Sequence, residues 1–265
     1  MRLAAIHEPA LIKEYLNRPD RGNLIYYCNN LEPPFWENTQ WFGLMAGEHL
    51  AALAMLITKY QVPALLATSY RPDDPYLPEL LERLRPYLPQ DLYCHVDSHA
   101  VERLPSGMAG QRVSPYYNMK LVDRNRLPVL DPGRAVRLGT ADKPAIIALL
   151  EESHPDYLLD EEFCDAGYYW GIREAGRLVS LAGVVAKSEE YAIAAVGCVT
   201  THPDFRRAGL ATQVMAALIH DLTPRYGEIV LNVKQANQNA VRCYRKLGFE
   251  VIGEFAEVCG SDCRF

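Results

Sequence analysis

The spacing of hydrophobic residues in the second half of the chain switches repeatedly between the periods of strands and helices. Residues 192–201 form an apolar run typical of a strand, and from Leu210 to Leu222 an apolar residue recurs at every fourth position, which predicts a helix. Residues 228–234 alternate apolar and polar side chains, which predicts another strand. Residues 237–248 then show helical spacing, and extended character resumes at 249–255. This alternation predicts a mixed α/β fold.

Two hairpins are predicted, one in each half of the chain, at 41–57 and 169–185. Both combine aromatic-rich strands with an Ala-Gly turn, and their glycines lie at a nearly constant offset. The pattern fits an internal duplication, and it also fits two unrelated hairpins, because glycine is common at such turns. The paired positions are Gly43 with Gly171 (171 − 43 = 128) and Gly47 with Gly176 (176 − 47 = 129).

Composition narrows the class of protein. The chain has 265 residues, 49% of them hydrophobic, and a formal net charge of −6, which disfavours a general nucleic-acid binder. No apolar run reaches eighteen residues, and Pro9 interrupts the N-terminal segment too early for a secretory signal. We therefore expect a soluble cytoplasmic protein with no membrane or nucleic-acid partner.

The cysteines are expected to be reduced structural thiols, because their number is odd and none forms a Cys-x-x-Cys pair. Cys259 and Cys263 could resemble half of a zinc site, but no second ligand pair accompanies them, so no metal is expected. The seven are Cys28, Cys94, Cys164, Cys198, Cys243, Cys259 and Cys263.

A linker is predicted where charge, two prolines and a glycine occur together in residues 124–133. We expect a first domain at 1–125, a linker at 126–133 and a second domain at 134–265.

The strongest chemical signal is the segment Arg206 to Ala211, between the predicted strand and helix. A helix N-terminus presents free N–H groups and the positive end of the helix dipole, and Gly209 permits close approach of the main chain to an anion. Two arginines add charge, so the loop suits a pyrophosphate. The Walker and Gly-x-Gly-x-x-Gly patterns are absent. The loop alone also fits a solvated turn.

A second pattern follows in Asn237-x-x-Ala240-x-x-x-Tyr244-x-x-x-Gly248-Phe249. Together with Arg-x-x-Gly-x-Ala in the first loop, its order and spacing resemble the GNAT superfamily of acetyl-CoA-dependent N-acetyltransferases. The resemblance covers about residues 134–258. It implies an α/β fold with a mixed sheet, and the repeated hairpin suggests two tandem acyl-CoA N-acyltransferase-like domains, the first degenerate.

The resemblance also implies that acetyl-CoA is the co-substrate and that a primary amine is the acceptor. The main chain at Cys198 and Val199, splayed from the neighbouring strand, would pair with pantetheine and direct an N–H group at the thioester oxygen. Gly197 is consistent with a bulge there. The expected cofactor-binding residues are Cys198, Val199, Thr201, Arg206, Arg207, Ala208, Gly209, Leu210, Ala211, Thr212 and Asn237. Asn237 also fits a plain helix cap.

Tyr244 is the expected catalytic acid for the leaving thiolate, although the same residue fits a packed core aromatic. The position matching the family's glutamate base is Asn232, which cannot accept a proton at neutral pH. The open alternatives are another carboxylate (Glu228, Glu254 or Glu257), a water chain, or an acceptor that arrives partly neutral. His202, just before Pro203, is expected to be a surface turn residue.

Acceptor specificity is expected to come from the variable parts of the second domain and from the first domain's contact with it. Residues 151–165 contain seven carboxylates, which fit either an amine-attracting cleft or a solvated helix face. In the first half, residues 67–75 lack glycine and contain Asp73 and Asp74 where phosphates would lie, so we expect no cofactor there. The first domain is expected to shape the acceptor site. The alternative function is a non-catalytic acyl-CoA sensor or scaffold.

Overall fold

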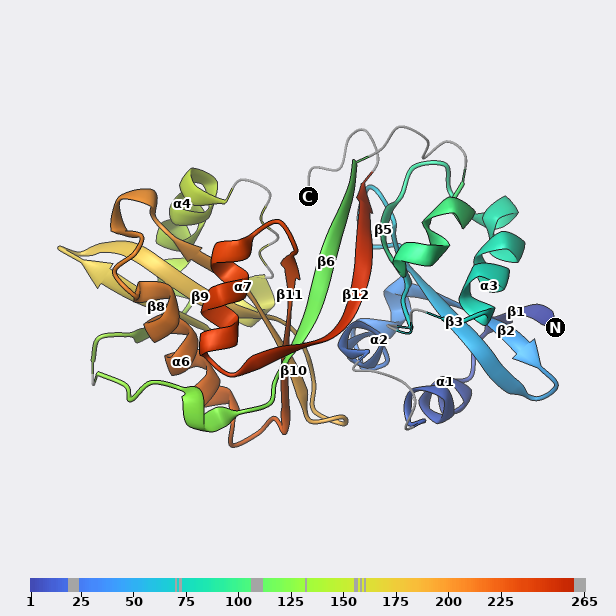
Figure 1. Ribbon diagram of the computed structural model, residues 1–265, viewed down its shortest axis with the longest axis horizontal. Helices are drawn as coiled ribbons and strands as arrows, with labels where there is room; N and C mark the ends of the chain where they lie inside the picture. The colour runs from blue at the N-terminus through green and yellow to red at the C-terminus, as the bar shows by residue number, and fades with distance from the viewer. Residues whose placement is uncertain are drawn as a thin grey trace. The chain divides into compact units, whose positions relative to one another are not determined.

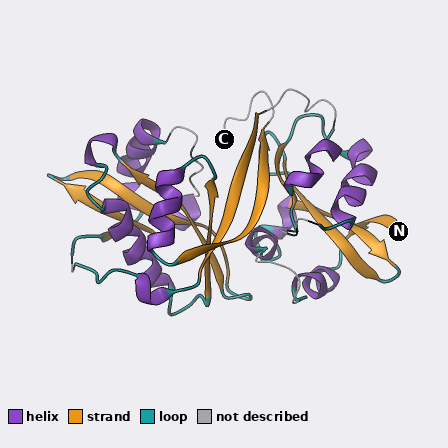
Figure 2. Cartoon of the chain, viewed as in Figure 1, coloured by secondary structure: helices purple, strands orange, loops and turns teal. Residues whose placement is uncertain are grey.

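The computed structural model describes residues 1–18, 24–69, 71, 73–105, 112–131, 133–154, 157, 159 and 161–259. The described chain divides into two compact units, each an α/β structure with strands flanked by helices (Figure 1, Figure 2). The first unit contains Met1–Asn118, Val233–Ala236 and the chain from Val251, and the second contains Met119–Asn232 and Asn237–Glu250. The expected mixed α/β fold is therefore present in both halves.

In the first unit the strand order is β1-β2-β3-β4-β5-β12. Strands β4 and β5 are parallel, and the other neighbours are antiparallel. The strands are β1 (Arg2–Ile6), β2 (Thr39–Ala46), β3 (His49–Ile57), β4 (Ala64–Ala67), β5 (Tyr93–Val96) and β12 (Phe249–Cys259). The helices are α1 (Pro9–Leu16), α2 (Ile25–Asn30) and α3 (Tyr76–Leu84), with 3-10 turns at Trp36–Asn38, Arg85–Tyr87 and Ser98–Arg103.

The second unit repeats this order as β7-β8-β9-β10-β11-β6, again with the fourth and fifth strands parallel. Its strands are β7 (Val136–Leu138), β8 (Tyr169–Glu174), β9 (Arg177–Ser188), β10 (Ile193–Thr201) and β11 (Glu228–Lys234), together with the end of β6 (Arg112–Leu121), whose residues up to Asn118 belong to the first unit. Its helices are α4 (Lys143–Ser153), α5 (Glu161–Asp165), α6 (Leu210–Leu222) and α7 (Gln238–Lys246), with 3-10 turns at Arg124–Arg126, Thr140–Asp142 and Pro203–Phe205. The shared order supports the duplication that the two hairpins indicated.

The last strand of each sheet comes from the other half of the sequence. In the first unit β12 pairs with β5, from Ala256 opposite Val96 to Cys259 opposite Tyr93. At the edge of the second unit's strands, β11 has β6 as its neighbour, and β6 crosses the boundary between the units at Asn118. The compact units therefore differ from the expected linear division at 126–133.

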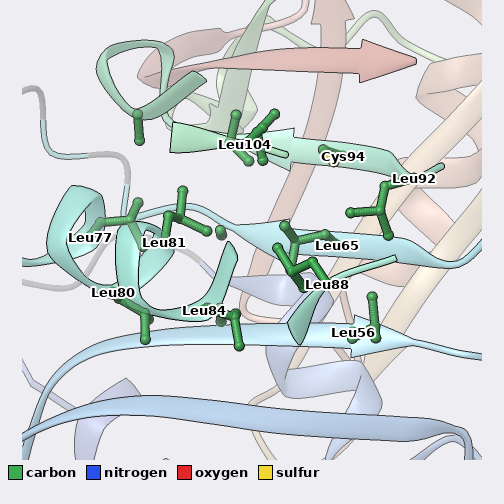
Figure 3. Packing of buried hydrophobic residues seen from close by; sticks show 14 of the residues in the cluster. Leu56, Leu65, Leu77, Leu80, Leu81, Leu84, Leu88, Leu92, Cys94 and Leu104 are labelled. Atoms are coloured by element: carbon green, nitrogen blue, oxygen red, sulfur yellow. The ribbon is translucent and has the colours of Figure 1, made fainter. Parts of the chain in front are cut away.

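The core of the first unit is a leucine cluster between α3 and the sheet. Four leucines of α3 point toward side chains of β3, β4 and β5 (Figure 3). Their spacing of three and four residues is that of one helix face, and burying a leucine side chain contributes about 2 kcal/mol. The α3 leucines are Leu77, Leu80, Leu81 and Leu84.

In the second unit α6 packs against β8, β9 and β10, and α4 packs against β9 and β10. The continuous run of buried residues in β9 agrees with a strand covered on both faces. No disulfide joins the six cysteines that lie among the described residues, and Cys28, Cys94, Cys164 and Cys259 are buried. Cys263 lies outside the described residues. In the described part of the chain, no helix is long and apolar enough to cross a membrane.

Candidate functional site

The two parallel strands at the centre of the second unit separate part of the way along their length. β10 pairs with β11 only from Ala195 opposite Val230 back to Ile193 opposite Glu228. Beyond this point, residues 196–201 of β10 do not pair with residues 231–234 of β11, and the structure describes both segments in full. The expected splay at Cys198 and Val199 is therefore present. It leaves main-chain N–H and C=O groups directed into the gap.

A bulge sits at the same place in β10. The register with β9 shifts between Gly197 and Thr200, so Cys198 and Val199 together lie opposite the single residue Ala182, and Cys198 adopts a left-handed φ of 50°. Gly197 is required because a Cβ would lie 2.7 Å from Cγ1 of Val185. The buried Tyr169 hydroxyl donates to the Cys198 Sγ atom at 3.7 Å. The bulge turns the main chain of Cys198 and Val199 away from a regular ladder.

The loop after β10 has the backbone shape of an anion-binding turn. Arg207 and Gly209 both have left-handed φ angles, 68° and 76°, and α6 begins at Leu210. Among the described residues, no acceptor is recorded for the backbone N–H groups of residues 207–212. Residues 206–209 are exposed, and a Cβ on Gly209 would meet open space. The N–H groups and the positive end of the α6 dipole thus face solvent together.

Three polar residues among the expected cofactor-binding residues, at the end of β10 and the start of α6, are held by local hydrogen bonds. Arg206 Nε donates to the carbonyl of Thr201 at 3.1 Å, which ties the start of the loop to the end of β10. The Thr201 hydroxyl lies 2.8 Å from that of Ser180. The Thr212 hydroxyl lies 3.5 Å from Cys243 Sγ, which brings the start of α6 beside α7. Ala208 is exposed, Ala211 is half-buried and Leu210 is buried in the core.

Tyr244 lies on the buried face of α7, with 8% of its surface exposed. Its ring packs against Phe249 at a centroid distance of 6.2 Å. Its hydroxyl makes no hydrogen bond to any described residue. Burial, and secondarily the neighbouring Cys243 thiol, raise the pKa of Tyr244 well above its ordinary value. The side chain therefore stays a phenol at neutral pH, with a donor that no described residue uses.

Asn237 acts as a helix cap. Its Oδ1 accepts the N–H of Ala240 at 3.2 Å, and the residue is exposed. Gly248 ends the motif in a left-handed conformation, φ 94°, and a Cβ there would lie 2.0 Å from the carbonyl oxygen of Asp123. The glycine of the second motif is thus explained by close packing of two backbone segments.

The carboxylates considered as a base have different surroundings. Glu228 is paired with Lys120 at 2.7 Å, at the start of β11 where the strands are still joined. Glu254 is exposed and accepts from Gln235 Nε2 at 3.2 Å. Glu257 belongs to the first unit. In the second unit β11 therefore offers Asn232, half-buried, at the family's base position.

His202 contradicts the expectation of a surface residue, because only 4% of its surface is exposed. Its Nδ1 accepts the N–H of Asp204 at 3.3 Å, and its Nε2 lies 3.1 Å from Oε1 of Glu152 on α4. Arg177 holds the other oxygen of Glu152 at 2.6 Å. The bond to His202 and then the pair with Arg177 lower the pKa of Glu152. No local sequence pattern indicates this contact, because Glu152 lies fifty residues earlier.

The acidic segment at residues 151–165 forms ion pairs with lysine and arginine side chains of the same unit. Lys143 pairs with Glu161 at 3.0 Å and with Asp165 at 2.9 Å, and these bonds raise its pKa to about 12. Glu152 is held by Arg177. Asp156 and Asp160 lie outside the described residues. The described carboxylates thus resemble a solvated, salt-bridged helix face more than a free anionic cleft.

Comparison with known proteins gives a family match for part of the chain and a fold for nearly all of it. Residues 140–249 match the family model described as "Acetyltransferase (GNAT) family". No curated protein matches the chain. The chain is similar in fold to a GNAT-family protein from Novosphingobium aromaticivorans, at 22% identity and TM-score 0.59, covering 92% of this chain and 98% of that one.

Two further solved structures match almost the whole chain. A Drosophila protein has 15% identity and TM-score 0.67, covering 98% of this chain and 99% of that one. A tandem GNAT protein from the clavulanic acid biosynthesis pathway has 14% identity and TM-score 0.57, covering 97% of each chain. At these identities the likeness shows the fold, which is that of two tandem acyl-CoA N-acyltransferase-like domains.

Proposed function

We propose, on the premise that residues 140–249 are a GNAT-family domain, that the protein transfers an acyl group, most simply acetyl, from acyl-CoA to a primary amine. The observation that carries the proposal is the gap between β10 and β11 ending at the open N-terminus of α6. A strand edge with free main-chain groups suits the pantetheine amides, and a helix N-terminus suits a pyrophosphate. The unpaired part of β10 and the start of α6 follow one another along the chain, so the two chemistries occur in the order that CoA requires.

The binding roles follow from these surroundings. The N–H groups of residues 207–212 bind the pyrophosphate, and Arg206 and Arg207 add positive charge. Cys198 and Val199 pair with the pantetheine amides through the main chain. Thr201 and Asn237 contribute polar side chains to the cofactor site. Among the described residues no group of three potential metal ligands is present, and the proposed chemistry uses none.

Bound acyl-CoA supplies the activated thioester carbon. The acceptor nitrogen forms a C–N bond to this carbon, the C–S bond breaks, and the N–H of Val199 donates to the oxygen that gains negative charge. Tyr244 gives its phenol proton to the departing sulfur and is reprotonated from solvent. Since Asn232 accepts no proton, the amine releases its proton to water.

A second candidate, a non-catalytic acyl-CoA sensor or scaffold, is favoured by one observation, the Asn232 side chain at the position of the base. The two functions differ in whether thiol release depends on an amine. The full chain should be incubated with acetyl-CoA and a library of primary amines while free thiol is measured. Release that requires an amine supports the transferase, whereas CoA binding by calorimetry without release from any amine supports the sensor.

A further inference from the structure

The first unit contains a group of rings on the sheet face opposite its leucine core. Cys94, Val96, Ala256 and Val258 point into that core, so the alternation of a strand places their neighbours on the other face. The rings touch one after another, with centroid distances of 6.1, 4.8 and 5.3 Å for Tyr26–His95, His95–Phe255 and Phe255–Tyr116. Tyr93 adds a further contact to His95 at 5.1 Å. The five rings of this cluster are Tyr26, Tyr93, His95, Tyr116 and Phe255.

A single carboxylate, Glu257, lies within this ring cluster. It is directly opposite His95 across the β5–β12 ladder, and 12% of its side chain is exposed. The Tyr93 hydroxyl donates to Glu257 Oε2 at 2.7 Å. Because that hydroxyl has one hydrogen, His95 Nε2 must be the donor in its 2.8 Å bond to Tyr93. His95 Nε2 is also 3.8 Å from the carboxylate.

The charge of Glu257 has no lysine or arginine counter-ion among the residues that the structure describes. No such residue of the described chain lies within 4 Å of its carboxylate. Although burial opposes ionisation, the nearby His95 and hydrogen bonds from Tyr93 and Tyr116 lower the pKa of Glu257 to about 2. A recessed carboxylate that stays ionised at neutral pH therefore gives the cluster a negative field.

The rings remain partly open to solvent. Tyr26, Tyr93, His95 and Tyr116 are all half-buried, whereas Phe255 is fully buried. The Lys234 ammonium already lies over the face of Tyr116, 5.9 Å from its centroid. The electron-rich face of at least one ring is thus accessible to a cation.

We propose that the ring cluster around Glu257 is a binding site for an organic ammonium group. Aromatic faces attract cations through the ring quadrupole, more strongly when the cation is partly desolvated, and an ionised carboxylate adds Coulomb attraction. The Glu257 carboxylate already accepts hydrogen bonds from the Tyr93 and Tyr116 hydroxyls, so the cation is held by its charge and by the rings. An inorganic cation would instead need several oxygen ligands, and the described residues hold no group of three acidic or histidine ligands.

The test uses the full chain without acetyl-CoA, so its result is independent of the proposed acyl transfer. Choline and its neutral isostere 3,3-dimethylbutan-1-ol are titrated by calorimetry into the wild type, Glu257→Gln and Glu254→Gln. Glu254 is the matched control, because it is an exposed carboxylate of the same strand and its replacement changes the net charge equally. Choline should bind at least tenfold more tightly than the alcohol, and only Glu257→Gln should remove this preference.

A second variant covers the case in which Glu257→Gln does not fold. Tyr116→Leu removes a half-buried ring and leaves the carboxylate in place, so choline binding should weaken about fivefold or more. Circular dichroism establishes the fold of each variant. Equal binding of choline and the alcohol to the folded wild type, or equal loss in the Glu257 and Glu254 variants, would overturn the proposal.

Discussion

The first helix after the fourth strand of each unit begins in opposite ways. In the first unit the buried Asp74 carboxylate accepts the N–H groups of Tyr76 and Leu77, at 2.9 and 3.3 Å, so the start of α3 already holds an anion. In the second unit α6 follows the exposed Gly209, and its first N–H groups face solvent. The same topological position is therefore closed by the protein's own charge in one unit and open to a ligand's charge in the other.

The strands before these helices differ in the same sense. β4 pairs with β5 along all four of its residues, from Ala64 to Ala67, whereas β10 leaves β11 after Ala195. The described residues of the first unit thus contain neither the gap nor the open helix terminus. The expectation that Asp73 and Asp74 exclude a phosphate stays a prediction, and Tyr70 and Pro72 of that loop lie outside the described residues. The two units share a strand order, but among the described residues only the second contains the gap between its two parallel strands.

The sharpest difference concerns Tyr244, since the first unit has the 3-10 turn Ser98–Arg103, without a tyrosine, between its fifth strand and the next. Tyr244→Phe keeps the ring on Phe249 and removes only the hydroxyl. Turnover should fall about 10²-fold or more, the usual contribution of a positioned acid, while CoA affinity stays within about twofold. Steady-state kinetics and calorimetric titration measure the two effects. Unchanged turnover would reduce Tyr244 to a packing residue.

Gly209 and Gly47 allow a matched substitution in the two units. Both have left-handed φ angles, 76° and 66°, and open space where a Cβ would lie, so valine causes similar backbone strain at each. Gly209→Val should weaken CoA binding about tenfold or more, because the loop loses its shape and its close approach to the phosphates. Gly47→Val should leave CoA affinity unchanged. Equal affinities for the two folded variants would locate the phosphates elsewhere.

His202 should act as a positioning residue, because it holds the loop that leads to the start of α6 and does not itself contact the cofactor. His202→Gln disturbs the bonds to Asp204 and Glu152 that hold the loop, so KM for acetyl-CoA should rise about fivefold, as for the loss of one hydrogen bond, with kcat nearly unchanged. His220, an exposed histidine on α6, is the control. A fall in kcat with an unchanged KM would argue against a role through the loop.

The smallest expected change in cofactor binding is that caused by Asp74→Ala. Losing this cap should lower the free energy of unfolding by about 1 kcal/mol, while CoA binding stays unchanged because the first unit takes no part in it. Asp73→Ala removes the exposed neighbouring carboxylate and should change neither quantity. Urea denaturation and calorimetry measure the pair. New CoA binding by the Asp74 variant would mean that the capping charge alone closes the first unit.

The sequence by itself determined most elements of the second unit. Apolar periodicity predicted β10, α6, β11 and α7 within two residues of their observed bounds, because one side of each element must be buried. Two short motifs were enough to indicate the family, since the residues that shape a helix N-terminus lie next to one another in the chain. The nearly constant offset of the two hairpins was also consistent with the repeated strand order.

Tertiary structure alone decided which distant residues meet. The linear division at 126–133 follows linker composition, but β6 and β12 complete the sheets of the opposite halves, and strand pairing between residues more than 100 positions apart leaves no local pattern. His202 was expected at the surface from its neighbour Pro203, yet Glu152 and Phe205 enclose it. The ring cluster around Glu257 likewise joins α2, β5, β6 and β12. Such contacts depend on the packing of whole elements, which the hydrophobic pattern of any single segment does not specify.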